Sequence, residues 1–203
     1  MSKELVGLIS GILVVISVVP YSIRTYQQKV HPNPTTWFLW TIIGLTLLLT
    51  YNSSGAGANV WPAIFGFTNP LLIFLLLLHN REKWEKMNGV EKICLVFGIA
   101  ALLVWLFVKD SKNLSQYALY IAIIADGCAA IPTISFVWNH PDKDRPFAWI
   151  LFGIGYGLVI FAISDYTFAN YILPLYMFVG ALFIALPLIM YRIKKSIPLK
   201  EWI

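Results

Sequence analysis

The sequence has few charged residues for its length. Charged residues make up 12% of the 203 positions, whereas 59% are hydrophobic, and the mean hydropathy is +0.73. A chain so poor in charge cannot cover a compact body with a water-facing surface, which argues against a soluble globular domain. The composition is that of an integral membrane protein, so we expect the chain to lie in a lipid bilayer.

Cysteine and histidine are also scarce, which limits redox and metal chemistry. Cys94 and Cys128 both fall within apolar runs, so we interpret them as packing residues. The three histidines, His31, His79 and His140, share no metal-ligand spacing with cysteine or acidic residues. We therefore expect no metal and no other cofactor.

Apolar runs long enough to cross a bilayer predict seven transmembrane helices. They cover residues 5–22, 36–53, 58–78, 92–108, 115–138, 147–164 and 168–191. No small-residue cleavage site ends the first run, so we expect it to remain as a helix and not to be removed as a signal peptide. The absence of targeting signals and long tails favours a bacterial inner membrane.

Basic residues are unevenly divided between the two sides of such a bundle. One side carries Lys3, Lys109 and Lys112, and the other carries twelve basic residues. The positive-inside rule then predicts an N-terminus outside and a C-terminus in the cytoplasm. Because the twelve are spread over four short segments, the net charge of +5 indicates attraction to anionic lipid and not a nucleic-acid partner. The twelve are Arg24, Lys29, Arg81, Lys83, Lys86, Lys92, Lys143, Arg145, Arg192, Lys194, Lys195 and Lys200.

The chain contains an internal repeat. A single gap-free offset of 112 residues superimposes Pro20 on Pro132, Pro34 on Pro146, Trp37 on Trp149, Ile42 on Ile154 and Pro62 on Pro174. Three spans reverse the direction of the chain, so the one span between the copies makes them parallel. We predict an all-α fold with a three-helix repeat at 1–80, a linker helix at 81–112 and a second repeat with a cytoplasmic tail at 113–203.

This plan resembles the SWEET and PQ-loop (MtN3-like) transporter superfamily, and the chain is similar to a divergent seven-helix member. Where those proteins carry proline followed by glutamine, this sequence has Pro20-Tyr21 and Pro132-Thr133. The same broad plan is shared by KDEL-type receptors and by vitamin carriers of the PnuC kind. The resemblance implies two bundles that rock about a central site, with substrates among sugars, amino acids or vitamins.

Proline within a helix removes one backbone donor and weakens the helix at that point. Pro20, Pro132, Pro62 and Pro174 are therefore candidate hinges, and the resemblance implies that such prolines serve alternating access. Static kinks, which are common in membrane helices, are the alternative interpretation.

Asp126 is isolated in an apolar stretch and stands eleven residues after Ser115, about 16 Å into the bilayer. A carboxylate at that depth costs on the order of 2.5 to 3.5 kcal/mol, so we expect it to face the bundle interior. Ala129, Ala130 and Thr133 continue the same helical face with small side chains. Asp126 either contacts substrate or carries a proton, or it is hydrogen-bonded to a neighbouring helix.

Further site candidates lie on the third span of each repeat and beside the prolines. Asn69 falls at mid-depth and resembles the asparagine with which SWEET-like transporters hold sugar, although an interhelical hydrogen bond would equally satisfy its amide. In the second copy Tyr176 or Asn170 could compensate. Tyr21 and Thr133, next to the hinge prolines, are expected to face the inner vestibule.

Aromatic residues open the second span of each repeat. Trp37 and Trp149 fall at the membrane surface, which favours an interfacial belt over substrate stacking. Trp40 and Phe152, one turn deeper, are candidates for a gate or a pocket wall.

Enzymatic functions fit the sequence poorly. An intramembrane aspartyl protease needs two deep aspartates, and only Asp126 is deep. A retinal protein needs a lysine in the last span, and Phe168 to Met190 contains none. We predict a carrier of a small polar solute that works by alternating access. The alternative is a receptor or sorting protein of the same fold. The sequence does not decide whether the protein forms a homo-oligomer.

Overall fold

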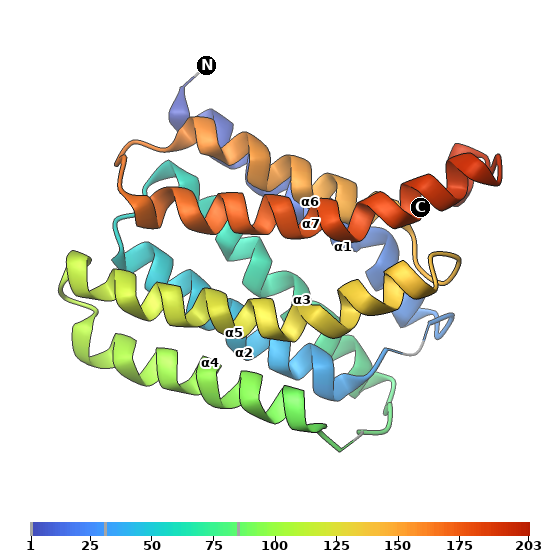
Figure 1. The fold of residues 1–203 in the computed structure, drawn as a ribbon, viewed down its shortest axis with the longest axis horizontal. Helices are drawn as coiled ribbons and strands as arrows, with labels where there is room; N and C mark the ends of the chain where they lie inside the picture. Colours follow the sequence, from blue (N-terminus) through green and yellow to red (C-terminus); the bar gives the residue numbers. More distant parts are fainter. Residues whose placement is uncertain (1, 31, 85) are drawn as a thin grey trace.

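The computed structural model describes residues 2–30, 32–84 and 86–203, which form α-helices and short 3-10 turns without a strand (Figure 1). The helices are α1 (Lys3–Tyr26), α2 (Pro34–Ser53), α3 (Trp61–His79), α4 (Gly89–Val108), α5 (Lys112–Asn139), α6 (Pro146–Val159) and α7 (Phe168–Lys194). The 3-10 turns are η1 (Ala58–Val60), η2 (Ile160–Ala162) and η3 (Leu199–Glu201).

Among these described residues, six helical segments are long and apolar enough to cross a membrane. They include α1, α2, α4, α5, α7 and the continuous segment Ala58–His79, which joins η1 to α3. The segment Pro146–Ala162, made of α6 and η2, is apolar but shorter. The chain is therefore an all-helical protein whose helices fit an integral membrane protein.

The helix starts follow local sequence signals. Pro34 and Pro146 are the first residues of α2 and α6, where a missing backbone donor costs nothing. α4 begins with a capping box, in which Asn88 accepts from the Glu91 backbone N–H at 2.9 Å and Glu91 accepts from the Asn88 backbone N–H at 2.9 Å. Ser111 caps α5 without a reciprocal bond: its side-chain oxygen accepts from the Leu114 backbone N–H.

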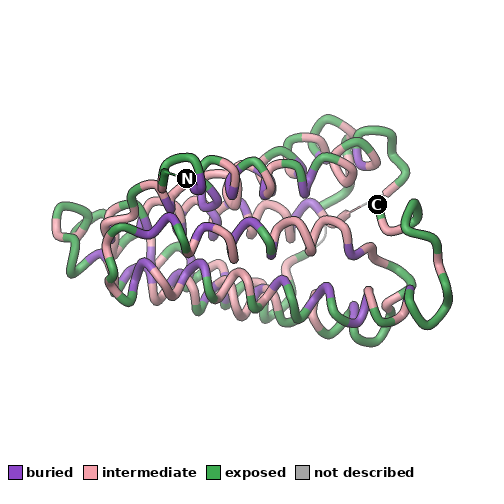
Figure 2. The backbone as a smooth tube through the Cα atoms, turned by 90° about the horizontal axis from the view of Figure 1, so that it is seen from above, coloured by how far each residue is buried: buried purple, intermediate pink, exposed green. Residues whose placement is uncertain are grey.

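The helices pack in a fixed order. α3 contacts both α1 and α2, and α7 contacts both α5 and α6. α1 lies along α6, α2 lies along α5, and α4 packs against α2 and α5 at the side of the bundle. The largest buried cluster joins α2 to α5 through residues such as Ile43, Leu47 and Ala125, and buried positions follow the inward sides of the helices (Figure 2).

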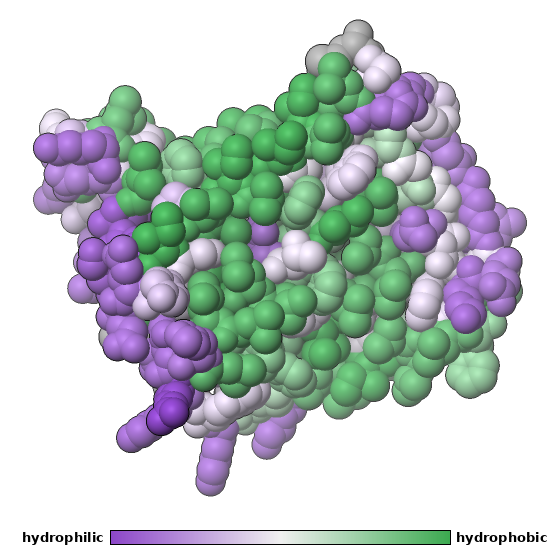
Figure 3. Space-filling view, turned by 180° about the vertical axis from the view of Figure 1, so that it is seen from behind, coloured by the Kyte–Doolittle hydropathy of each residue, from purple (hydrophilic) through white to green (hydrophobic). Residues whose placement is uncertain are grey.

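The two ends of the bundle differ in charge. The basic end comprises residues 27–30, 80–84, 140–145 and 195–203, and together with the adjoining helix ends it gathers most of the lysines and arginines. The N-terminal end has residues 2, 54–57, 109–111 and 163–167. Burial, followed by the charges of Arg24 and Arg192, lowers the pKa of Arg145 at the basic end. Hydrophobic atoms cover the middle of the surface and hydrophilic atoms gather toward the ends (Figure 3), as expected of a protein surrounded by lipid.

The crossing of α1 and α6 depends on a glycine. A Cβ at Gly155 would lie 2.7 Å from Val14 Cγ2 and 2.8 Å from the Ser10 carbonyl oxygen. Real Cβ atoms do not approach backbone so closely, so only glycine allows the two helices to lie at this distance.

We expect Gly155→Ala to destabilise the protein by about 1 to 3 kcal/mol because the helices must move apart. The matched control is Gly180→Ala on α7, where a Cβ would meet nothing within 4 Å and the better helix propensity of alanine should leave stability equal or higher. Thermal unfolding followed by circular dichroism measures both, and equal melting temperatures for the two variants would contradict the close approach at Gly155.

The prolines lie partly where the sequence places them. Pro20, Pro132 and Pro174 are inside α1, α5 and α7. Pro62 is the second residue of α3, where proline removes no hydrogen bond within the helix. The expectation that Pro62 interrupts this helix is therefore wrong. The interruption of α3 comes from Pro70. α7 has a second internal proline, Pro187, which the repeat does not predict.

Candidate functional site

Asp126 lies midway along α5 and is half-buried. Its Oδ2 accepts a hydrogen bond of 2.7 Å from the Tyr176 hydroxyl of α7. The tyrosine ring reaches the aspartate over Gly127, where a Cβ would stand 3.5 Å from the Tyr176 oxygen. Two of the residues that the sequence singles out separately are thus brought together, and the carboxylate has a polar partner at membrane depth.

Asn69 lies midway along α3 and is buried. Its Nδ2 donates to the Val14 carbonyl oxygen of α1 at 2.8 Å. This is the interhelical hydrogen bond that the sequence left as the alternative to a substrate contact. Among the described residues, no hydrogen bond joins Asn69 to Asp126.

The aromatic candidates form two runs near the basic end. In the first, Tyr21 packs on Trp37 with ring centroids 5.4 Å apart, and Trp37 meets Trp40 edge-on at 5.3 Å. In the second, Trp149 meets Phe152 at 6.4 Å. Indole rings next to the charged loops fit an interfacial belt, and the deeper Trp40 and Phe152 extend it inward.

The second run continues into the bundle. Phe152 packs on Tyr156 with ring centroids 4.8 Å apart. Tyr156 is buried and donates its hydroxyl to the Pro62 carbonyl oxygen of α3 at 3.1 Å. Gly66 leaves room for that hydroxyl, because a Cβ there would lie 2.6 Å from it. Tyr156 therefore ties α6 to α3, which is a contact that the sequence does not predict.

Thr133 and Pro132 line a small cavity between α2, α4 and α5 at the basic end. Its volume is about 60 Å³, and its other lining residues include Thr36 and Glu91, which are joined by a 3.0 Å hydrogen bond. That volume holds a few water molecules but is far below the roughly 300 Å³ of a typical small-molecule site. The cavity must widen before Thr133 can contact a solute.

A buried polar network that the sequence does not predict closes the N-terminal end. Its centre is Asn170 at the start of α7, which is 0% exposed. The Asn170 backbone carbonyl accepts from the Tyr51 hydroxyl of α2 at 3.0 Å, and the Asn170 Oδ1 accepts from Asn59 Nδ2 of η1 at 3.2 Å. The Asn59 amide also donates to the Tyr51 hydroxyl oxygen at 2.6 Å.

The same asparagine holds the connection between α6 and α7. Its Nδ2 lies 3.0 Å from the Asp165 carbonyl oxygen and 3.4 Å from the Gly55 carbonyl oxygen. Lys112 forms an ion pair with Asp165 beside Gly55, whose φ of +96° favours glycine. The loops that join α2 to α3 and α6 to α7 are thus fastened to each other at this end.

One sequence signal could have located part of this network. A proline inside a helix leaves the carbonyl four residues earlier without its helical donor, so Pro174 frees the Asn170 carbonyl and Pro187 frees the Phe183 carbonyl. Each receives a side-chain donor instead, because Tyr51 binds the first and Trp138 Nε1 binds the second at 3.0 Å. The sequence shows which carbonyls need partners, but not which partners reach them.

The described residues hold no group of three or more histidine, cysteine or acidic side chains that could bind a metal, and His31 lies outside them. Of the polar side chains that the sequence singles out, Asp126 and Asn69 lie midway along their helices. Asp126 is bonded to Tyr176, and Asn69 is bonded to the Val14 carbonyl oxygen. No protein-family model, no curated protein and no solved structure matches the chain.

Proposed function

We propose that the protein is a carrier of a small polar solute, in the class of sugars, amino acids or vitamins, that works by alternating access. The proposed fold is the doubled three-helix module of SWEET and PQ-loop proteins, with α4 as the linker. The proposed orientation is an outward N-terminus and a cytoplasmic C-terminus in a bacterial inner membrane, following the concentration of charge at the basic end.

The packing order supports a doubled module. We call α1–α3 the first triplet and α5–α7 the second. When each helix is replaced by its counterpart in the other triplet, the contact between α1 and α6 becomes the contact between α5 and α2, and both contacts exist. In each triplet the third helix contacts the other two. The starts of α2 and α6 are also 112 residues apart, at Pro34 and Pro146. Reciprocal contacts of this kind are expected of two repeats related by a pseudo-two-fold axis.

Side chains at equivalent positions also perform equivalent tasks. Asn80, at the end of α3, donates to the Thr25 carbonyl oxygen near the end of α1 at 2.7 Å. Arg192, which is 112 residues later, donates to the Pro141 carbonyl oxygen just after α5 at 3.2 Å. Each third helix is thus tied to its first helix at the basic end, although the residue types differ and the sequence comparison does not pair them.

The observation that carries the functional proposal is the Asp126 and Tyr176 pair. By the repeat offset Asp126 corresponds to Val14, and both accept a hydrogen bond from the third helix of their triplet. In the first triplet the acceptor is a backbone carbonyl, so the fold does not require an acid at this position. A carboxylate kept at membrane depth without structural need favours a role in solute recognition or proton transfer.

Alternating access also needs two states that open to opposite ends of the bundle. The N-terminal end is fastened by the Asn170 network, and the cavity beside Thr133 is too small for a solute. In our proposal Pro20, Pro132 and Pro174 provide the flexible points at which the triplets rock to open a path. Pro62, at the start of α3, takes no part in this.

A receptor or sorting protein of the same fold is the second candidate. The observation that favours it is the Asn170 network, because its amide and carbonyl groups are buried and mutually satisfied between the triplets. If that network never opens, a ligand could bind from the basic end without crossing.

Ligand screening followed by a transport assay tests the proposal. Purified protein is screened by thermal shift against sugars, amino acids and vitamins, since a bound ligand raises apparent stability according to its affinity. We expect one chemical class to raise the melting temperature. Vesicles containing the protein should then exchange labelled solute of that class with the inside. Stabilisation without exchange would establish the receptor instead, and no stabilisation together with no exchange would reject both.

A further inference from the structure

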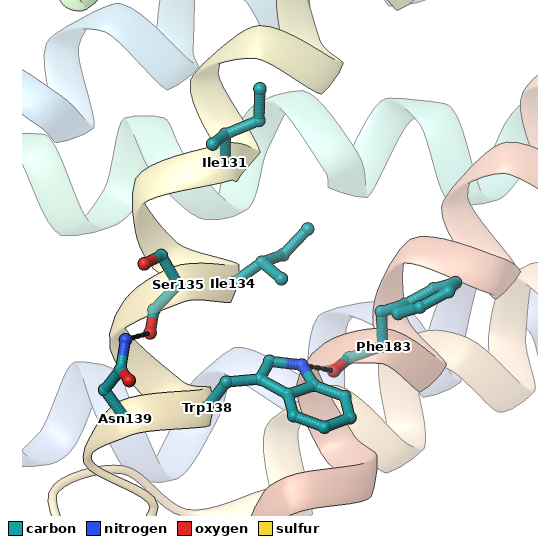
Figure 4. Close-up of a pocket in the computed structure, with 6 residues that line it drawn as sticks. All are labelled: Ile131, Ile134, Ser135, Trp138, Asn139 and Phe183. Carbon is teal, nitrogen blue, oxygen red and sulfur yellow. Dashed lines mark hydrogen bonds between the residues drawn. The ribbon is translucent and has the colours of Figure 1, made fainter.

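A groove on the outside of the bundle lies between α5 and α7, toward the basic end (Figure 4). Its volume is about 400 Å³, and its lining residues are Ile131, Ile134, Ser135, Trp138, Asn139 and Phe183. Five of these lie on one face of α5, with Ile131 just before Pro132 and the other four after it, and Phe183 faces them from α7. The volume suits a drug-sized molecule or one hydrocarbon chain and is too small for a helix about 10 to 12 Å wide.

The groove has a defined shape, because a hydrogen bond fixes the Trp138 side chain that forms one of its walls. Pro187 has no N–H to offer to the Phe183 carbonyl oxygen, and Trp138 Nε1 donates to that oxygen at 3.0 Å (Figure 4). The indole therefore bridges α5 and α7 on the outer side of the contact that Val137 makes with Ile184 and Leu188. Trp138 is 49% exposed, so its ring remains available to a molecule in the groove.

The lining changes from apolar to polar along the groove. Ile131, which is 60% exposed, and Phe183, which is 54% exposed, lie at the deeper end. Ser135, Trp138 and Asn139 follow toward the basic end. A phospholipid has the same order of groups, with its acyl chain at depth and its glycerol and headgroup at the surface.

The distances along the helices match one leaflet. Phe183 and Lys194 are eleven residues apart on α7, which is about 16 Å of helix. Half of a typical hydrocarbon core is about 15 Å. A chain whose tip lies beside Phe183 would thus bring its headgroup to the level of Lys194.

That level carries exposed positive charge. Lys194 and Lys195 end α7, and both are exposed. Lys143, in the connection after α5, is also exposed. Lysines immediately beyond a membrane span attract anionic lipid headgroups.

We propose that this groove binds one anionic phospholipid of the leaflet next to the basic end. The acyl chain lies along Ile131, Ile134 and Phe183, Trp138 packs beside the glycerol region, and Lys194 with Lys195 holds the phosphate. The ligand is a structural or regulatory lipid and not the transported solute, so the inference does not depend on transport. Because the groove lies beside α5 beyond Pro132, its occupant would bias any movement of that helix.

Native mass spectrometry of the delipidated protein tests this inference, with phosphatidylglycerol and phosphatidylcholine of identical acyl chains as probes. We expect phosphatidylglycerol to bind about 25-fold more tightly, since each lysine near an anionic group contributes a factor of about five. The double variant Lys194→Gln and Lys195→Gln should remove this preference while both lipids still bind. Ser135→Phe, which fills the groove, should weaken both lipids.

The matched control is Leu103→Phe on α4, whose side chain is 52% exposed away from the groove and whose replacement should change nothing. Ile131→Trp provides a second groove-filling variant, and unchanged melting temperatures show that the variants fold. Equal binding of the two lipids to the parent protein would overturn the proposal. So would groove-filling variants that bind lipid as Leu103→Phe does. A dimer that Ser135→Phe dissociates would assign the groove to a second copy of the chain.

Discussion

Asp126→Asn is expected to reduce flux of the solute identified by screening by about tenfold to a hundredfold. Asparagine keeps the shape of the side chain, and its Oδ1 can still accept the hydrogen bond from Tyr176. It cannot carry a negative charge or exchange a proton. Hydrogen bonds to charged groups contribute about 1.5 to 3 kcal/mol, which corresponds to the stated range in affinity.

The control for this prediction is Asp110→Asn, because Asp110 is an exposed aspartate at the N-terminal end. Initial rates of solute uptake into vesicles, taken at acidic and at neutral pH, measure both variants. The melting temperature of Asp126→Asn should be close to that of the parent protein, since its hydrogen bond survives. If uptake is unchanged at both pH values, Asp126 is a structural side chain and has no part in solute recognition or proton transfer.

Asn170→Ala should be among the most destabilising single changes in the protein, at about 3 kcal/mol or more. The change leaves the Asp165 and Gly55 carbonyl oxygens without their amide donor and Asn59 without one acceptor. An unsatisfied buried group costs about 1 to 3 kcal/mol. Asn59 is buried and the two carbonyl oxygens are partly buried, so the three losses together account for the stated value. For a chain of this length the melting temperature should fall by about 6 to 12 °C.

Asn139→Ala is the matched control, because Asn139 is exposed and donates only locally, to the Ser135 carbonyl oxygen at 2.8 Å. Its effect should stay within about 0.5 kcal/mol. Thermal unfolding in the same detergent compares the two variants. Similar shifts for both would mean that the Asn170 network does not hold the N-terminal end together.

Hydropathy and periodicity predict most of the fold because they report where the chain enters and leaves lipid. The sequence places Pro34 and Pro146 in the loops before the second span of each repeat, whereas the structure makes them the first residues of α2 and α6. The window at 58–78 combines η1 with α3, which hides that Pro62 stands at a helix start. Composition alone cannot separate a 3-10 turn from the helix that follows it.

The candidate site was less predictable because the sequence gives depth along a helix but not the partner that each side chain meets. The sequence singles out Asp126 for its depth and Tyr176 as a replacement for the asparagine that the second copy lacks, and only the packing of α5 against α7 reveals that they bond to each other. Asn69 is singled out for its depth too, yet its donor is satisfied by a backbone carbonyl. Pro174 marks the Asn170 carbonyl as needing a donor, but the sequence does not show that Tyr51 reaches it, and no sequence pattern marks the bond from Tyr156 to the Pro62 carbonyl.

The shortness of α6 has a consequence for the surrounding membrane. The 14 residues of α6 and the three of η2 extend over about 27 Å, somewhat less than the hydrocarbon thickness of a typical bilayer. Ile154 and Phe161 are 49% and 73% exposed, so this short segment presents apolar side chains to its surroundings. In a bilayer of typical thickness we expect hydrophobic mismatch to thin the lipid slightly beside α6, so that shorter acyl chains would fit this side of the protein better.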